Sequence, residues 1–211
     1  MFEHHYLNSF DIVVFQKAKG DDKICGDSYL VQADDQHVLC AVADGLGSGE
    51  WAWEASSQAT QTIETYSKES LDSVLGHVNA SLLKTRGAVV SVLRIAPETN
   101  HFEFCGIGNV NVKIVSPDDS KKVGHPMPNP GFLSGRPVDL KHEQHYFPSE
   151  GCFVIYSDGI GLINNTIKDI AKRFEQTSHE VFLSELQALL SSESVSDDMT
   201  FIIGQHRPQF F

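Results

Sequence analysis

The sequence has 211 residues, of which 41% are apolar and 21% are charged. This length fits one domain with a buried core, and we expect residues 1–211 to form a single domain. The formal net charge of −12 argues against a partner that is nucleic acid or an anionic membrane, because both would be repelled. The acidic balance has two interpretations: it serves solubility, or several carboxylates converge on cations.

Targeting and zinc-binding patterns are missing from the sequence. No run approaches the ~20 apolar residues of a membrane span, and the N-terminus does not resemble a secretion signal. The cysteines form no C-x-x-C pair and no two histidines stand four residues apart, so a zinc site is not supported. We therefore expect a cytoplasmic protein with buried free thiols.

The first third of the chain predicts three strands and then two helices. The strands are expected at 10–15, 27–32 and 37–43, and the third is continuously apolar over 38–43, as in a strand that is covered on both faces. A helix is predicted over 50–67 from the spacing of its small and apolar residues. Ser70 can cap the second helix, whose apolar positions are Leu71, Val74, Leu75, Val78 and Leu82.

Most of the remaining elements are strands. They are predicted at 87–95, 101–107, 111–115, 121–123, 143–147, 152–156 and 201–203, with a Pro- and Gly-rich loop over 125–137 and helices near 167–174 and 179–190. Regular alternation of strands and helices is absent, which disfavours a doubly wound parallel sheet. The order instead predicts an α+β fold, in which two antiparallel sheets pack face to face and helix pairs lie outside them.

Four aspartates stand at the ends of predicted strands. Asp27 begins the second strand, Asp44 follows the third, Asp158 follows strand 152–156, and Asp197 precedes the last strand. A short side chain at the end of a buried strand can be aimed accurately, as metal coordination requires. Gly45 after Asp44 lets the backbone approach closely, so that its carbonyl can also serve as a ligand.

All-oxygen ligands suit Mg²⁺ or Mn²⁺ rather than zinc. Two such ions about 3.5–4 Å apart can activate a water and hold a phosphoryl group. An Asp-Gly pair by itself is common in turns, and the run 44–49 could also be a phosphate-binding glycine loop before a helix. However, this run lacks the Lys and Ser/Thr of a P-loop and the full dinucleotide fingerprint, so the ordered set of aspartates favours the metal site.

The ordered motifs resemble those of the metal-dependent serine/threonine phosphatases of the PPM family, in its bacterial SpoIIE-like branch. The matching stretches are 26–27, 43–50, 157–159 and 197–200. Because they are spread along nearly the whole chain, the resemblance covers the entire domain. It implies a four-layer α-β-β-α sandwich without the flap of larger members, with two ions of Mn²⁺ or Mg²⁺ at one end.

The resemblance also implies a role for each residue of the site. Asp44 would bridge both ions, and the carbonyl of Gly45 would bind one of them. Asp158 and Asp197 would bind the other ion. Asp27 would lie on the Gly45 side and act directly or through water, so that the four aspartates are the candidate catalytic residues.

The implied substrates are phosphoserine or phosphothreonine on STAS-type proteins of the stressosome. The enzyme would then regulate the general stress response negatively. Two alternatives stay open at this point: a phosphatase of another anti-sigma-factor antagonist, and a pseudophosphatase that binds phosphoproteins without hydrolysing them.

Three features depart from the family pattern or lack a role. Leu46 stands where many eukaryotic members have histidine, so no side chain is assigned as the acid for the leaving group. The upstream region lacks the arginine that often holds phosphate; Arg86 and Arg136 are candidates to replace it and are otherwise surface residues. Trp51 and Trp53 either pack the start of the first helix or contact a protein substrate.

Overall fold

The computed structural model describes residues 1–20, 23–117, 123–160, 164–177, 179–191 and 197–207. The strands of this part of the chain are β1 (Phe2–Leu7), β2 (Phe10–Lys17), β3 (Asp27–Ala33), β4 (Val38–Gly45), β5 (Ala88–Ala96), β6 (His101–Ile107), β7 (Asn111–Val115), β8 (His142–Tyr146), β9 (Cys152–Tyr156) and β10 (Met199–His206). The α-helices are α1 (Glu50–Thr65), α2 (Leu71–Ser81), α3 (Asn164–Gln176) and α4 (His179–Ser191). None of the described helices is long and apolar enough to cross a bilayer.

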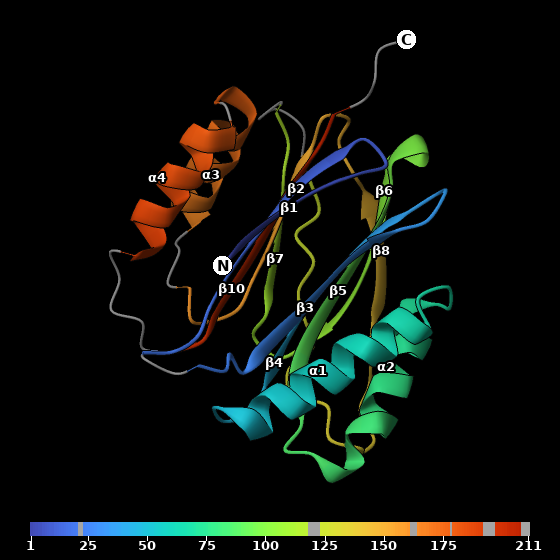
Figure 1. Cartoon of the computed structure of the whole chain (residues 1–211). Helices are drawn as coiled ribbons and strands as arrows, with labels where there is room; N and C mark the ends of the chain where they lie inside the picture. The colour runs from blue at the N-terminus through green and yellow to red at the C-terminus, as the bar shows by residue number, and fades with distance from the viewer. Residues whose placement is uncertain (21–22, 118–122, 161–163, 178, 192–196, 208–211) are drawn as a thin grey trace.

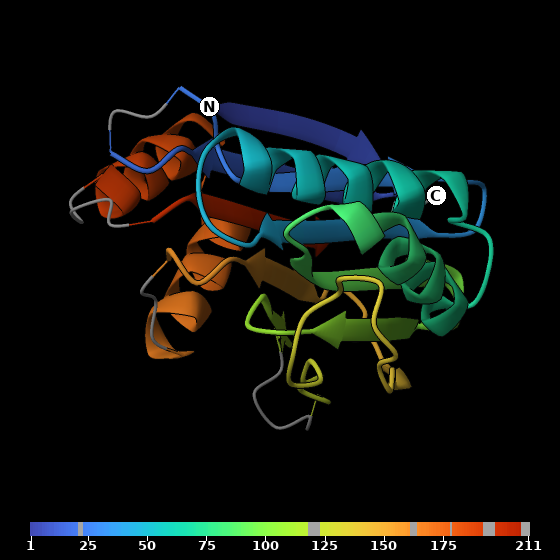
Figure 2. The same ribbon diagram turned by 90° about the horizontal axis from the view of Figure 1, so that it is seen from below.

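The strands form two antiparallel sheets of five strands each. Sheet A has the order β1-β2-β10-β9-β7, and sheet B has the order β3-β4-β5-β6-β8. In Figure 1, α3 and α4 lie outside sheet A, and α1 and α2 lie outside sheet B. The second view also separates the helix pairs, with α1 and α2 in cyan to green and α3 and α4 in orange (Figure 2).

Apolar side chains fill all three spaces between these four layers. One cluster lies between the sheets, a second lies between sheet B and α1 and α2, and a third lies between sheet A and α3 and α4. Strand β4 contributes Val42 to the first cluster and Ala43 to the second, because successive side chains of a strand point to opposite faces. The predicted fold of two antiparallel sheets flanked by helix pairs is confirmed.

The predicted elements agree with the structure except at the N-terminus, and one predicted strand lies mostly outside the described residues. Strand β1 was not predicted, because its half-exposed pattern includes Glu3, His4 and His5 and resembles a polar terminus. It lies at an edge of sheet A and is paired there with β2. Of the strand predicted at 121–123, residues 121 and 122 lie outside the described residues.

Two smaller predictions can be compared with the structure. Ser70 occupies the N-cap position of α2, but its hydroxyl makes no capping hydrogen bond. The cysteines are free thiols, three of them buried and Cys25 partly buried. The expectation of unpaired thiols is therefore confirmed.

Candidate metal centre

Asp27 and Asp44 face each other across neighbouring strands of sheet B. The register of the antiparallel pair β3-β4 places Asp27 directly opposite Asp44, and residues opposite each other project to the same face of a sheet. Val42, two residues before Asp44 and hence on the same face, packs between the sheets. Both carboxylates therefore point to the space between the sheets, at one end of the sandwich.

Sheet A contributes Asp158 and Asp197 from the ends of two paired strands. Asp158 follows β9 and Asp197 precedes β10, which are neighbours in the sheet. The pairing continues past β9, where Ser157 N donates to Thr200 O at 3.0 Å. The side chain of Asp197 is 49% exposed, and Lys19 Nζ lies 4.0 Å from its Oδ1 atom.

Asp198, the neighbour of Asp197, ties the first segment of the chain to the last strand. Its Oδ2 atom accepts a hydrogen bond from Gly26 N and its Oδ1 atom accepts one from Lys19 N, both at 2.9 Å. A Cβ atom on Gly26 would lie 2.8 Å from that Oδ2 atom and 2.9 Å from the Cβ of Ala52, so this position requires glycine. The buried carboxylate thereby holds the start of β3 beside the start of β10. Sequence reasoning included Asp198 in its motif but assigned it no role.

Two further glycines allow backbones to approach closely at this end. A Cβ on Gly45 would lie 1.9 Å from Ala52 O, and one on Gly159 would lie 2.0 Å from Asp198 O. Any side chain at these positions would collide with backbone atoms, which cannot move as a flexible side chain could. Gly45 therefore lets α1 pack closely against the end of β4. The predicted role of its carbonyl as a metal ligand stays a prediction.

Burial, and after it the charge of neighbouring carboxylates, raises the pKa of three aspartates of this cluster. Burial raises the pKa of Asp27 to about 7, and the charges of Asp198 and Asp158 add to this increase. Burial also raises the pKa of Asp44 to about 8, with further contributions from the other carboxylates of the cluster. For Asp158, burial and then the charge of Asp197 raise the pKa. A cation placed among these groups would relieve both the repulsion and the loss of hydration.

The carboxylate of Asp27 can accept further hydrogen bonds or bind a cation. Both of its carboxylate oxygens are buried and have no hydrogen-bond partner among the described residues. The hydroxyls of Ser157 and Thr200 are near enough to oppose the rise in its pKa. Neither makes a hydrogen bond of normal geometry to Asp27, and each accepts one elsewhere, Ser157 Oγ from Thr200 N at 2.9 Å and Thr200 Oγ1 from Gln16 Nε2 at 3.2 Å. A buried carboxylate without a partner is unfavourable, and a bound cation would supply the missing partner. Because the neighbouring groups offer only oxygen atoms, a hard divalent cation such as Mg²⁺ suits them.

The cluster is not a closed coordination cage. Within the described ranges, no three or more His, Cys, Asp or Glu side chains are arranged to hold a metal ion. A bound ion would therefore need other ligands besides these side chains. That requirement is compatible with Mg²⁺, which usually retains several waters and takes few carboxylates from the protein.

Asn109 is a residue of this region that sequence reasoning did not assign. Its Nδ2 atom donates a hydrogen bond to Asp158 Oδ2 at 2.6 Å, and this contact lowers the pKa of the carboxyl. In the sequence, Asn109 is recognisable only as part of a break between two strands. Its contact with Asp158 depends on β7 lying beside β9, a pairing of strands that are distant in the sequence.

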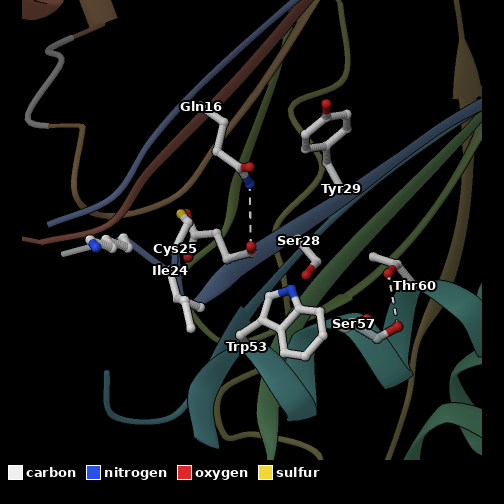
Figure 3. Close-up of a pocket in the computed structure, with 10 residues that line it drawn as sticks. Gln16, Ile24, Cys25, Ser28, Tyr29, Trp53, Ser57 and Thr60 are labelled. Carbon is white, nitrogen blue, oxygen red and sulfur yellow. Dashed lines mark hydrogen bonds between the residues drawn. The ribbon is translucent and has the colours of Figure 1, made fainter. Parts of the chain in front are cut away.

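A cavity of about 470 Å³ opens beside Asp27, between β3 and α1. Figure 3 shows the Trp53 side chain at this cavity, near Ser28 and Ser57, and Gln16 Nε2 donating to the carbonyl of Asp27. Trp51 and Trp53 are 62% and 47% exposed. Neither tryptophan is therefore fully buried at the start of the helix, and contact of the two with a protein substrate stays a prediction.

Comparison with known proteins identifies the relatives of this chain. Residues 34–207 match the family model for stage II sporulation protein E (SpoIIE). The phosphoserine phosphatase RsbX of Bacillus subtilis (strain 168) is 35% identical over 194 residues, which cover 92% of this chain and 93% of that protein. The family match begins after Asp27, and the β3-β4 register, the hydrogen bond from Gly26 N to Asp198 and the charges of Asp158 and Asp198 link Asp27 to the remaining carboxylates.

Among the solved structures that resemble this chain, two match it over more than nine-tenths of its length. The structure of RsbX in complex with magnesium has a TM-score of 0.84 and 32% identity, and the similarity covers 97% of this chain and 99% of that chain. The second structure is described as the bacterial stressosome, a modular system that has been adapted to control secondary messenger signalling. It has a TM-score of 0.80 and 25% identity, and the similarity covers 92% of this chain and 98% of that chain.

Proposed function

The chain belongs to the SpoIIE family of phosphatases, and on this premise we propose that it removes phosphate from serine or threonine side chains of STAS-type stressosome proteins in the cytoplasm. The observation that carries the proposal is the cluster of carboxylates from both sheets. Its member Asp27 has two buried oxygens without a partner among the described residues. Such a cluster suits a divalent cation and repels a bare phosphate, so the metal must come between enzyme and substrate.

The metal would be Mn²⁺ or Mg²⁺, with two ions held by Asp44, the carbonyl of Gly45, Asp158, Asp197 and Asp27. When bound, such ions supply an activated water and neutralise charge on the phosphoryl group. The protein's own part is to hold the carboxylates in place before the metal arrives.

Residues around the ligands support this positioning role. Asn109 donates to Asp158 and thereby orients that carboxylate. Asp198 accepts from two backbone N–H groups and fixes the strand start that carries Asp27. Leu46 is apolar and donates no proton from its side chain, so the leaving oxygen would take its proton from water.

The substrate class rests on the relatives. RsbX is named a phosphoserine phosphatase, and a second similar structure is described as the bacterial stressosome. Another anti-sigma-factor antagonist would offer the same phosphorylated side chain, which makes it the second candidate substrate. A pseudophosphatase is less well supported, because Asp27, Asp44, Asp158 and Asp197 are all present.

The test is phosphate release from a panel of phosphorylated STAS proteins. The wild-type protein is expected to release phosphate with Mn²⁺ or Mg²⁺ and to stop when a chelator is added. Asp44→Asn is expected to be inactive, whereas Asp35→Asn, in the exposed turn at the opposite end of β4, should retain full activity. No release by the wild type, together with no Mn²⁺ binding in calorimetry, would support a pseudophosphatase instead.

A further inference from the structure

Strand β3 is a free edge of sheet B beside the candidate metal centre. It is the first strand in the order β3-β4-β5-β6-β8, so that β4 is its only strand partner in the described part of the chain. Its first residue is Asp27, and the strand runs from there away from the carboxylates. An extended chain that pairs with this edge would therefore lead directly to the metal centre.

The backbone groups of alternate residues of β3 point away from β4. Gly45 N donates to Gly26 O at 3.3 Å, so the carbonyl of Gly26 faces β4. The direction of the backbone groups alternates along an antiparallel strand, and those of Asp27 therefore face outward. This is what the structure has, because the carbonyl of Asp27 accepts a hydrogen bond from Gln16 Nε2 of the other sheet at 3.2 Å.

The same alternation turns the N–H and C=O groups of Tyr29 and Val31 to the free edge. Within the described ranges, these four groups have no hydrogen-bond partner there. Both residues are half-buried, so the edge is reachable from solvent. A row of unpaired donors and acceptors on an edge strand is a template for a further strand.

β3 also lacks the charges that protect the other sheet edges. Proteins discourage unwanted strand addition by placing charged residues on an edge strand. The other edge strands follow this rule, since β1 carries Glu3, β7 carries Lys113 and β8 carries Glu143. In β3 the charged residue is Asp27, whose side chain is buried at the candidate metal centre, and residues 28–33 carry no charge. This edge is therefore left open to a partner strand.

The cavity of about 470 Å³ beside the metal centre lies along this edge. Residues 27–29 of β3 line one side of it, and Trp53 and Ser57 of α1 line the other (Figure 3). The Oγ atoms of Ser28 and Ser56 are 2.8 Å apart and join β3 to α1 by a hydrogen bond. The groove thus combines a backbone edge with an aromatic wall, and it is formed before a ligand arrives.

We propose that β3 pairs with an extended segment of the phosphoprotein substrate, on the N-terminal side of its phosphorylated residue. This inference rests on the proposed function and adds the surface that selects the substrate. Sheet B is antiparallel throughout, and an added antiparallel strand would run toward Asp27. With the phosphorylated residue opposite Asp27, the second and fourth residues before it would lie opposite Tyr29 and Val31.

This register gives each side chain of the segment a direction. Residues opposite each other project to the same face of a sheet, so the phosphorylated side chain would point the way that Asp27 does, toward the metal centre. The residue directly before it would lie opposite Ser28 and point toward α1. There the exposed ring of Trp53 offers an apolar surface.

The test uses a phosphopeptide with the sequence of a phosphorylated STAS protein, with four residues before the phosphoserine, in Mn²⁺. N-methylation of the second or fourth residue before the phosphoserine removes an N–H group that would donate to Tyr29 or Val31, and KM should rise about tenfold. N-methylation of the first or third residue is the matched control. Those N–H groups face away from β3, so KM should stay close to that of the unmodified peptide.

Val31→Pro tests the same pairing from the protein side. It removes an outward N–H group and leaves the hydrogen bonds between β3 and β4 in place, as an edge strand allows. The ratio of kcat/KM for the phosphopeptide to that for p-nitrophenyl phosphate should fall about tenfold, because the small substrate has no chain to pair. Ala33→Pro is the matched control, since its N–H group also faces outward but lies beyond the reach of the peptide. The peptide series uses the wild-type protein, so it decides the question even if Val31→Pro does not fold.

Two results would overturn the inference while leaving the proposed function intact. One is hydrolysis of p-nitrophenyl phosphate together with a peptide series that shows no alternation in KM, or with no activity on the phosphopeptide. The other is a dimer in solution that Val31→Pro dissociates, which would show that a second copy of the chain occupies this edge.

A wild-type protein that is inactive on every substrate would instead contradict the proposed function. In that case calorimetry of the same phosphopeptides still tests the edge of β3. Weaker binding of the peptides that are methylated at the second or fourth residue would support the pairing. Equal affinity for all the peptides, or no binding, would overturn it.

Discussion

Replacing Asp44 by asparagine should stabilise the metal-free protein while abolishing its activity. Burial and the neighbouring carboxylates raise the pKa of Asp44 to about 8, against about 3.9 in an unfolded chain. Between these values the folded state holds a proton that the unfolded state has released, so stability falls as pH rises. Below about pH 4 the folded and the unfolded state both hold the proton of Asp44, so the loss of stability is absent.

The size of the penalty follows from the pKa difference. Each pKa unit corresponds to about 1.4 kcal/mol, so an isolated Asp44 would lose more than 5 kcal/mol of stability by pH 8. The Asp44 side chain is only partly buried, and the cluster titrates as a coupled unit, so we expect about 2 kcal/mol. For a domain of this size that energy corresponds to about 4–8 °C in the thermal midpoint.

The assay is thermal unfolding in a chelator at pH 4.5 and pH 8, followed by circular dichroism. Asp44→Asn should unfold at a higher temperature than the wild type at pH 8, with a much smaller difference at pH 4.5. Adding Mn²⁺ at pH 8 should raise the midpoint of the wild type more than that of the variant. Asp35→Asn, in an exposed turn, serves as the control for charge alone. A variant that is less stable than the wild type at pH 8 without metal would refute the reasoning.

Three further substitutions test the framework around the carboxylates. Asn109→Ala removes the hydrogen bond to Asp158 and should weaken Mn²⁺ binding about tenfold, which calorimetry measures; unchanged affinity would exclude the orienting role. Gly45→Ala forces a Cβ atom against Ala52 O and should lower the free energy of unfolding in urea by about 2–3 kcal/mol; a neutral effect would contradict the close approach. Asp198→Ala leaves two backbone N–H groups without their acceptor and should lower the free energy of unfolding in urea by about 2–4 kcal/mol. Asp198→Asn keeps one acceptor oxygen, so the free energy of unfolding should fall by about half as much.

The sequence by itself determines which segments form strands and helices, and it places acidic residues at the ends of several strands. Strand β4 could be predicted as covered on both faces because its apolar run is continuous, and the structure places Val42 and Ala43 in two different apolar layers. The spacing of apolar residues along a strand or helix shows which of its sides are buried, and this spacing can be read from that segment alone. The aspartates at strand ends could be found in the same way, and their order allowed the family to be recognised.

Strand β1 marks the limit of this reasoning. Its polar residues at half-exposed positions have no local pattern that distinguishes a strand from an irregular terminus. It is a strand because β2 offers it a free edge in sheet A. Pairing with a neighbour, and not the propensity of its residues, decides that element.

Only the tertiary structure decided which side chains meet at the candidate site. Asp27 is opposite Asp44 through the β3-β4 register, and Asn109 reaches Asp158 because β7 lies beside β9. The structure places Arg86 against Gly47 in the loop after Asp44, and within the described ranges it makes no ion pair or hydrogen bond with the carboxylates. The sequence encodes each of these residues, but their contacts depend on strand register, and register is set by how whole sheets bury their apolar faces.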